Sequence, residues 1–414
     1  ATRDGGRVLN ASELIDRDPI YATKLAALER AWKDFSGHEN FDSFLETRTP
    51  LLEDFATFNS LAEVFGSKWS RWPEEYRRPD TQAVARWGDA NRDRLAFWCW
   101  VQWLVAEQIR DAAETIGLVH DVAVGTDPEG ADAWIWQDAL RPQMHIGAPP
   151  DEFNARGQDW ILPPFDPHAL RARSYEPFIA TLRAAFAHGA GVRIDHVMGL
   201  FRLYWIPDGA TPTHGAYVRY PHHDLLSILA LESQRAGAFV VGEDLGTVEP
   251  IVRKEMAKRN MLSYRILWFE PKPPRDYPKH SFAAVTNHDL PTISGMWTGA
   301  DLAEQEAMGL EPDFEAHRAV RERVVAASGV DEGAPTEEVI SRLHELLAEA
   351  SSAVVVATLE DALGVSSRPN LPGTTTERPN WSIPLAVRLE AIEHHPLARA
   401  IATKLSVGRD RHTP

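Results

Sequence analysis

The segment GVRIDHVMGL, residues 191–200, combines apolar and charged residues in a way that indicates the fold class. A short apolar run leads in, and Arg193, Asp195 and His196 then arrive within four positions. This pattern is typical of a buried strand whose end carries charged side chains. Charged groups are costly at the edge of a core unless they have partners or a task, so the stretch marks a candidate functional site.

Similar apolar runs recur along the chain after Gly117, and segments with helical periodicity alternate with them. Repeated strand–helix units of this kind predict an α/β fold whose parallel strands form a sheet or a barrel. The helices expected between the strands are 175–188, 223–236 and 337–350. The expected strands, besides 191–196, lie within 118–125, 239–246, 263–270, 282–289 and 353–363.

The first 115 residues are predicted to be mostly helical. Leu25, Leu28 and Trp32 recur at helical spacing, and residues 94–115 form a second long helical candidate. Six of the 14 tryptophans lie between Trp69 and Trp103. We expect these indoles to pack between helices rather than to bind sugars.

Composition excludes several classes of partner. The net charge of the 414-residue chain is −17, from 60 acidic against 43 basic residues, which disfavours nucleic acid and anionic membranes as partners. Cys99 is the single cysteine, so no internal disulfide is possible and a reducing compartment is expected. The longest apolar run, 96–106, is too short to span a bilayer, and ATRDGGRVLNASEL has no apolar centre typical of a signal peptide. We expect a soluble, cytoplasmic protein.

Polar side chains follow most of the expected strands at the point where each strand ends. In strand–helix proteins, ligands bind at this C-terminal edge of the strands. A single aspartate there can instead cap the following helix, and for Asp289 this alternative stays open. The polar groups concerned are His120 and Asp121; Arg193, Asp195 and His196; Glu243 and Asp244; and His288 and Asp289.

Two kinds of chemistry use several carboxylates from neighbouring strands. One is a divalent-metal site of the kind found in barrel lyases and isomerases, and the other is glycoside chemistry with one ionised and one protonated carboxyl group. Arg193, two residues before Asp195, points to the same side of the strand and favours an ionised, oriented carboxylate there. Glu243 follows an apolar run, where burial would raise the pKa of a general acid. Sugar chemistry is therefore favoured, and the metal site remains the alternative.

Segments in order along the sequence resemble the 4-α-glucanotransferases called amylomaltase or disproportionating enzyme, glycoside hydrolase family seventy-seven of the α-amylase superfamily. The resemblance covers about residues 118–384 and extends loosely over the helical part before it. Three of the segments resemble the family's catalytic strand ends: GVRIDHVMGLFRLYWIP, VVGEDLG and TNHDLPT. The others are VHDVAVGTDPEGADAW at 119–134, GAPPDEFNARGQDW at 147–160, which resembles an acceptor-side loop, and RPNLPGTTTERPNW at 368–381.

The resemblance implies a role for each matching residue. Asp195 would be the nucleophile, Glu243 the general acid and base, and Asp289 the stabiliser of the oxocarbenium-like transition state. Arg193 would orient Asp195, while His288 and Asp121 would contact the same glucose unit. Gln158 and Trp160 match acceptor-loop positions, and stacking of a glucose ring on an indole is chemically sound. Asn287 stands before His288 where the family usually has threonine, which we expect to alter that turn.

The implied architecture is a (β/α)8 TIM-type barrel, of which six strands are recognised in this chain. We expect a helical insertion subdomain at 1–115 and the barrel portion at 116–414, with the acceptor loop near 144–165. The family's first two strands would precede residue 1, leaving bare edges on the strands at 118–124 and 353–358.

The implied activity is retaining transfer of α-1,4-glucan segments among malto-oligosaccharides, maltose and glucose, without an organic cofactor or metal. A monomer or weak homo-oligomer is expected. The alternatives are a retaining glucan hydrolase of the α-amylase type and an inactive glucan-binding fragment.

Overall fold

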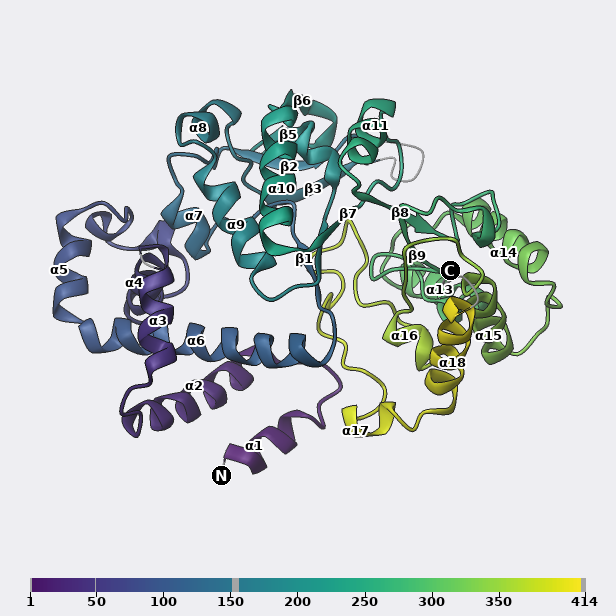
Figure 1. Ribbon diagram of the computed structural model, residues 1–414, viewed down its shortest axis with the longest axis horizontal. Helices are drawn as coiled ribbons and strands as arrows, with labels where there is room; N and C mark the ends of the chain where they lie inside the picture. Colours follow the sequence, from purple (N-terminus) through teal and green to yellow (C-terminus); the bar gives the residue numbers. More distant parts are fainter. Residues whose placement is uncertain (1, 49, 151–155, 411–414) are drawn as a thin grey trace. The chain divides into compact units, whose positions relative to one another are not determined.

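The computed structural model describes residues 2–48, 50–150 and 156–410 (Figure 1). The chain forms two compact units. The first holds residues 1–6 and 18–240, and the second holds residues 7–17 and 241–414. The boundary falls inside one strand, β7 (Phe239–Gly242).

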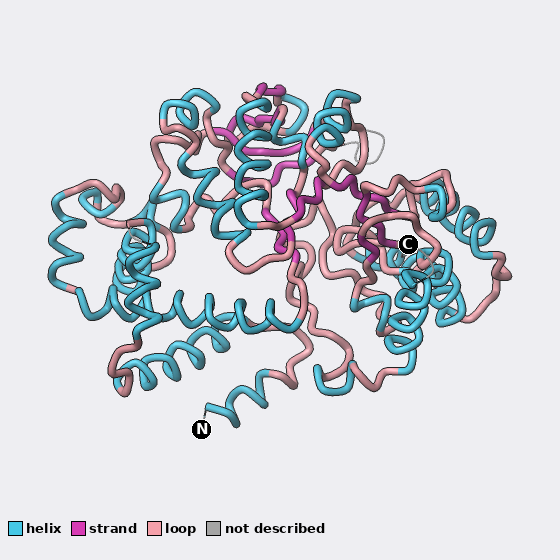
Figure 2. The backbone as a smooth tube through the Cα atoms, viewed as in Figure 1, coloured by secondary structure: helices cyan, strands magenta, loops and turns pink. Residues whose placement is uncertain are grey.

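Helices account for the regular structure up to Thr115, and no strand occurs among residues 2–48 and 50–115 (Figure 2). The tryptophans of this part pack between helices, as predicted. Trp72 is fully buried, and its ring centroid lies 5.2 Å from that of Phe58. The ring centroids of Trp100 and Trp32 are 5.6 Å apart. Each buried aromatic side chain contributes about 2–3 kcal/mol, which holds the helices together. They are α1 (Thr2–Leu9), α2 (Arg17–Lys33), α3 (Glu39–Arg48), α4 (Leu51–Phe65), α5 (Gln82–Ala90) and α6 (Arg92–Thr115).

Parallel strands begin in the first unit with β1 (Val119–Val122) and β4 (Gly191–Ile194). The two strands pair in parallel with Asp121 opposite Arg193, and all four residues of β4 are buried. The start of β7 joins them, because the Phe239 N–H donates to the Ala190 carbonyl. Gly191 permits this close approach, since a Cβ atom there would lie 2.8 Å from the Phe239 ring. The main helices beside these strands are α9 (Glu176–Phe186) and α10 (His222–Ala236).

In the second unit, parallel pairing continues from the end of β7 to β8 (Leu262–Ile266), β9 (Ser281–Ala284) and β10 (Val354–Val355). All six parallel strands expected from the sequence are therefore present, and the predicted α/β fold is confirmed. Among the described residues, β1 pairs only with β4, and β10 pairs only with β9. The predicted bare edges are thus present on both strands. The helices of this unit are α11 (Pro250–Lys258), α12 (Ile293–Thr298), α13 (Ala300–Ala307), α14 (Phe314–Ser328), α15 (Thr336–Leu347), α16 (Leu359–Ala362), α17 (Leu389–Ile392) and α18 (Pro396–Asp410).

A four-stranded antiparallel sheet in the first unit was not expected from the sequence. Its strand order is β3-β2-β5-β6, so the segment near 144–165, predicted to be a long loop, contains two strands. The strands are short and their pairing is irregular between Ile146 and Gly147, which leaves little period-2 signal. Residues 151–155 of that segment lie outside the described residues. The strands are β2 (Met144–Ala148), β3 (Gln158–Leu162), β5 (Arg202–Pro207) and β6 (Ala216–Arg219), with α7 (Ala131–Ile135) and α8 (Pro167–Ala172) nearby in the chain.

Within the described ranges, no helix is both long and apolar enough to cross a membrane. The boundary predicted near residue 115, between a helical insertion and a barrel portion, stays a prediction. The two compact units divide the chain at a different place, inside β7.

Candidate active site

Arg193 lies between two carboxylates at the ends of β1 and β4. Its Nη1 atom is 2.6 and 2.7 Å from the two carboxylate oxygens of Asp121, and its Nη2 atom is 3.0 Å from Oδ1 of Asp195. The parallel register places Asp121 beside Arg193, and Asp195 follows on the same side of its strand. The Arg193 side chain is only 10% exposed, whereas both carboxylates are partly open to solvent. The contact expected from the Arg193–Asp195 spacing is present.

Asp195 is not the N-cap residue of the helical turn that follows it. The 3-10 turn Val197–Leu200 has His196 at its N-cap position and no side-chain cap. Its carboxylate contacts the Arg193 guanidinium. The guanidinium of Arg193 also occupies the position between Asp121 and Asp195 that a divalent cation would need. Across the described residues, no group of three or more His, Cys, Asp and Glu side chains could hold a metal ion.

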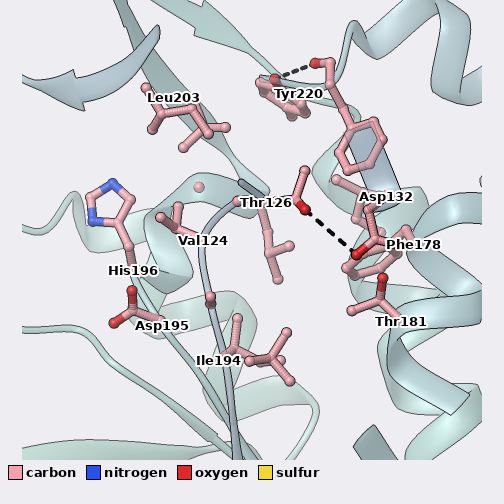
Figure 3. A pocket seen from close by; sticks show the side chains of 18 of the residues that line it. Val124, Thr126, Asp132, Phe178, Thr181, Ile194, Asp195, His196, Leu203 and Tyr220 are labelled. Atoms are coloured by element: carbon pink, nitrogen blue, oxygen red, sulfur yellow. Dashed lines mark hydrogen bonds between the residues drawn. The ribbon is translucent and has the colours of Figure 1, made fainter. Parts of the chain in front are cut away.

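Trp160 and Gln158, both on β3, form a pair next to this strand end. The Trp160 indole N–H donates to Oε1 of Gln158 at 3.1 Å. The Trp160 ring meets the ring of His196 edge-on, with centroids 5.3 Å apart and planes at 77°. Trp160 therefore contacts the residue that follows Asp195, and Gln158 contacts Trp160 (Figure 3 shows His196 beside Asp195).

His196 was recognised in the sequence as a polar residue at this strand end, but no role was predicted for it. It adopts a left-handed backbone with φ of 46°, which a histidine tolerates better than a β-branched residue. Burial, helped by the positive charge of Arg202, lowers the pKa of His196 to about 4. Its imidazole is therefore neutral at neutral pH and adds no second cation next to Asp195. Its position directly after Asp195 was the only available signal.

A cavity of about 320 Å³ in the first unit borders Asp195 and His196 (Figure 3). On another wall, the Thr126 hydroxyl donates to Asp132 at 3.5 Å, and burial raises the pKa of Asp132. The sequence analysis did not predict this cavity, although Asp121 and Asp195, which it singled out, lie in its lining. Most of its lining is apolar, including Val124, Phe178, Ile194, Leu200 and Leu203.

The second unit carries Glu243 and Asp244 directly after β7, and these two acids differ in their hydrogen-bond partners. Asp244 is fully buried and accepts hydrogen bonds from Arg253, Ser263 and the Tyr264 N–H at 2.6–3.0 Å. It ties β7 to β8 and is a structural residue. Glu243 accepts from the Leu245 N–H at 2.8 Å. Neither acid caps α11, whose N-cap position is Glu249.

Asp289 follows β9 and is held on several sides. Its Oδ1 atom accepts from Asn370 Nδ2 at 2.7 Å, and its backbone N–H donates to Oδ1 of Asn287 at 3.0 Å. The Nε2 atom of His288 lies 3.3 Å from its Oδ2 atom. The cap of α12 is Thr292, whose hydroxyl accepts from the Gly295 N–H. The helix-cap alternative for Asp289 is therefore wrong, and Asn287 supports the turn that positions it.

Asn370 and Arg368 were not predicted as site residues, although both lie in the segment RPNLPGTTTERPNW at 368–381. Arg368 Nη1 lies 3.3 Å from the Asp289 carbonyl oxygen. Arg378 is buried and fixes this segment, because it donates to the Arg368 carbonyl at 2.6 Å and to Glu304 at 2.9 Å. The segment after the last strand thus supports the Asp289 carboxylate.

The predicted residues fall into two sets. Asp121, Arg193 and Asp195, with Gln158 and Trp160, are in the first unit, and Glu243, His288 and Asp289 are in the second. Parallel strands that end in carboxylates, with one carboxylate paired to a buried arginine, are typical of barrel enzymes that act on glycosides.

Comparison with known proteins gives the family. A family model described as 4-alpha-glucanotransferase matches residues 2–389, so the chain belongs to the 4-alpha-glucanotransferase family. It is 41% identical over 406 residues to the 4-alpha-glucanotransferase of Mycobacterium tuberculosis, covering 90% of this chain and 56% of that protein. It is 31% identical over 450 residues to the Haemophilus influenzae 4-alpha-glucanotransferase, covering 97% of this chain and 64% of that one.

A solved structure agrees with this assignment. The amylomaltase of Corynebacterium glutamicum matches with a TM-score of 0.82 at 33% sequence identity, covering 95% of this chain and 60% of that one. The chain spans little more than half the length of the mycobacterial relative.

Proposed function

We propose that this chain carries the catalytic carboxylates of a 4-α-glucanotransferase that transfers α-1,4-glucan segments with retention of configuration. The observation that carries the proposal is the Arg193–Asp195 ion pair at the end of a buried parallel strand, in a chain of this family. The buried guanidinium favours the ionised form of the Asp195 carboxylate and restrains its direction, and a nucleophile needs both.

In the first step, a carboxylate oxygen of Asp195 attacks the anomeric carbon of the donor. The glycosidic C–O bond breaks, Glu243 gives its proton to the departing oxygen, and a glycosyl ester forms on Asp195. In the second step, Glu243 takes the proton from the 4-hydroxyl of an acceptor glucan. That oxygen then attacks the same carbon and releases the Asp195 carboxylate. Two inversions give net retention.

Asp289 and its neighbours act on the glucose unit that reacts. Its carboxylate, restrained by Asn370, stabilises positive charge on the sugar ring and accepts hydrogen bonds from sugar hydroxyls. His288 and Asp121 contact hydroxyls of this same glucose residue of the substrate. Trp160, fixed by Gln158 and His196, offers a stacking surface to the acceptor.

The proposed donors are malto-oligosaccharides, and the acceptors are maltose, glucose or longer glucans. The reaction as written needs only side chains of the protein. We further propose that the protein acts in the cytoplasm as a monomer or weak homo-oligomer, since its high negative charge opposes self-association.

A single incubation tests the proposed function. The protein is mixed with maltotriose, and the products are separated by chromatography. A ladder of longer glucans together with glucose supports a transferase. Glucose and maltose without longer products would instead indicate a hydrolase, and unchanged maltotriose would indicate an inactive glucan-binding chain. The family assignment favours the ladder.

A further inference from the structure

Trp381 in the second unit has an unusual backbone and an exposed side chain. Its φ angle is 58°, in the left-handed region that bulky residues rarely adopt. The residue is nevertheless 50% exposed, so burial of the indole in a core does not account for this conformation. Strained residues of this kind persist where the surroundings fix them, and they gather at binding sites.

Hydrogen bonds fix the chain on both sides of Trp381. Its N–H donates to the Pro369 carbonyl at 2.9 Å, and its own carbonyl accepts from Arg17. Arg17 also donates to the Ser382 hydroxyl at 2.8 Å, and the Ile15 N–H donates to the Ser382 carbonyl at 2.7 Å. All of these residues belong to the second unit. Several hydrogen bonds therefore fix the backbone that carries this exposed indole.

The indole lies next to residues of the candidate site. The ring centroids of Trp381 and His288 are 5.2 Å apart, with planes at 54°. His288 in turn lies 3.3 Å from Asp289, and Asn370, in the same segment as Trp381, donates to Asp289. An exposed indole fixed beside groups that can hydrogen-bond to hydroxyls is the arrangement that recognises a sugar ring.

We propose that Trp381 binds the glucan by stacking against the apolar face of a glucose ring, at a subsite adjoining His288 and Asp289. The axial C–H bonds of a pyranose form this face, and they meet the negative face of an indole favourably. The proposal rests on the proposed function, because it takes the ligand to be an α-1,4-glucan. It adds a binding residue from the segment after β10 that the sequence motifs did not assign.

Steady-state kinetics with maltotriose give the first test. Trp381→Ala raises KM roughly three- to tenfold and changes kcat less than about twofold, because stacking holds substrate and transition state alike. Trp381→Tyr, which keeps an aromatic face, recovers most of the affinity. Phe314→Ala is the matched control, because Phe314 is an exposed aromatic residue of the same unit on α14. It leaves KM unchanged.

A direct binding measurement separates this inference from the proposed function. The Asp195→Asn variant is labelled with 5-fluorotryptophan, and the fluorine resonance that disappears on adding Trp381→Phe is assigned to Trp381. Titration with maltotriose then shifts this resonance saturably, even if the chain proves to have no transferase activity. A Trp381 resonance that stays fixed, or an unchanged KM in a folded and active Trp381→Ala variant, overturns the inference while leaving the proposed function intact.

Discussion

The Nη2 atom of Arg193 lies 3.0 Å from Oδ1 of Asp195, and the guanidinium is almost buried while the carboxylate is partly open. The same guanidinium also binds Asp121 through its other terminal nitrogen. A lysine could supply the charge but not the planar fork that reaches two carboxylates at once. The orientation of Asp195 therefore depends on the shape of Arg193 as well as on its charge.

This relationship predicts that Arg193→Lys is not a conservative change. We expect kcat to fall by about 100-fold or more, because small displacements of reacting groups cost about that much. KM should change little, since the substituted residue acts through Asp195. Stopped-flow or steady-state assays with maltotriose measure both constants. A variant that keeps near-parental kcat would show that charge alone is sufficient at this position.

The neighbouring acids Glu243 and Asp244 should respond in opposite ways to substitution. Glu243→Gln should lose activity on natural glucans and keep its thermal stability, since this residue is proposed to transfer the proton. Asp244→Ala should lower stability by about 3 kcal/mol or more, because it leaves buried donors and Arg253 without their partner. Thermal unfolding and activity assays on the two variants provide the comparison. Equal losses of stability would contradict the division of tasks.

The Trp160–His196 contact predicts an effect on product distribution. Trp160→Ala removes the proposed acceptor platform, worth about 1 kcal/mol beyond area burial. Transfer should therefore fall more than hydrolysis, which shifts the products of maltotriose toward glucose and maltose. Trp160→Phe, which keeps an aromatic face, should shift them less. Equal losses in transfer and hydrolysis would place Trp160 in a structural role.

Asp361 predicts a pH-dependent stability. Its Oδ1 atom accepts from the Ile293 N–H at 2.7 Å, and burial raises the pKa of this carboxyl to about 7. The unfolded chain has a pKa near 3.9, so the folded state binds the extra proton between these values. The resulting stabilisation is complete below about pH 4 and is lost as the pH rises through 7.

Asp361→Asn keeps the acceptor oxygen and cannot ionise. The difference in Tm between Asp361→Asn and the parent should therefore grow in favour of the variant from pH 5 to pH 9, by roughly 2 °C or more. Taking this difference cancels the opposite effect of His196 and His344. Burial lowers the pKa of each of these histidines to about 4, which reduces stability as the pH falls. A difference that does not depend on pH would contradict the raised pKa.

The sequence was sufficient to predict the six parallel strands and the residues at their ends, because buried strands leave strong apolar runs. It was not sufficient for the antiparallel sheet, since β2 and β3 are short and irregularly paired, and their pairing depends on β5 from elsewhere in the chain. The sequence also could not distinguish the structural role of Asp244 from the proposed catalytic role of Glu243. The Asp244 carboxylate is buried through contacts with β8, which are distant in the sequence. Asn370 was missed for the same reason, as its contact with Asp289 joins positions 81 residues apart.

Covalent trapping tests whether Asp195 is the nucleophile. The Glu243→Gln variant is incubated with an activated glycosyl fluoride, which needs no acid to leave, and the protein is then digested and analysed by mass spectrometry. We expect one added glycosyl group on the peptide that contains Asp195, and none when Asp195→Asn is combined with Glu243→Gln. A label on another carboxylate, or labelling that persists without the Asp195 carboxylate, would show that Asp195 is not the nucleophile.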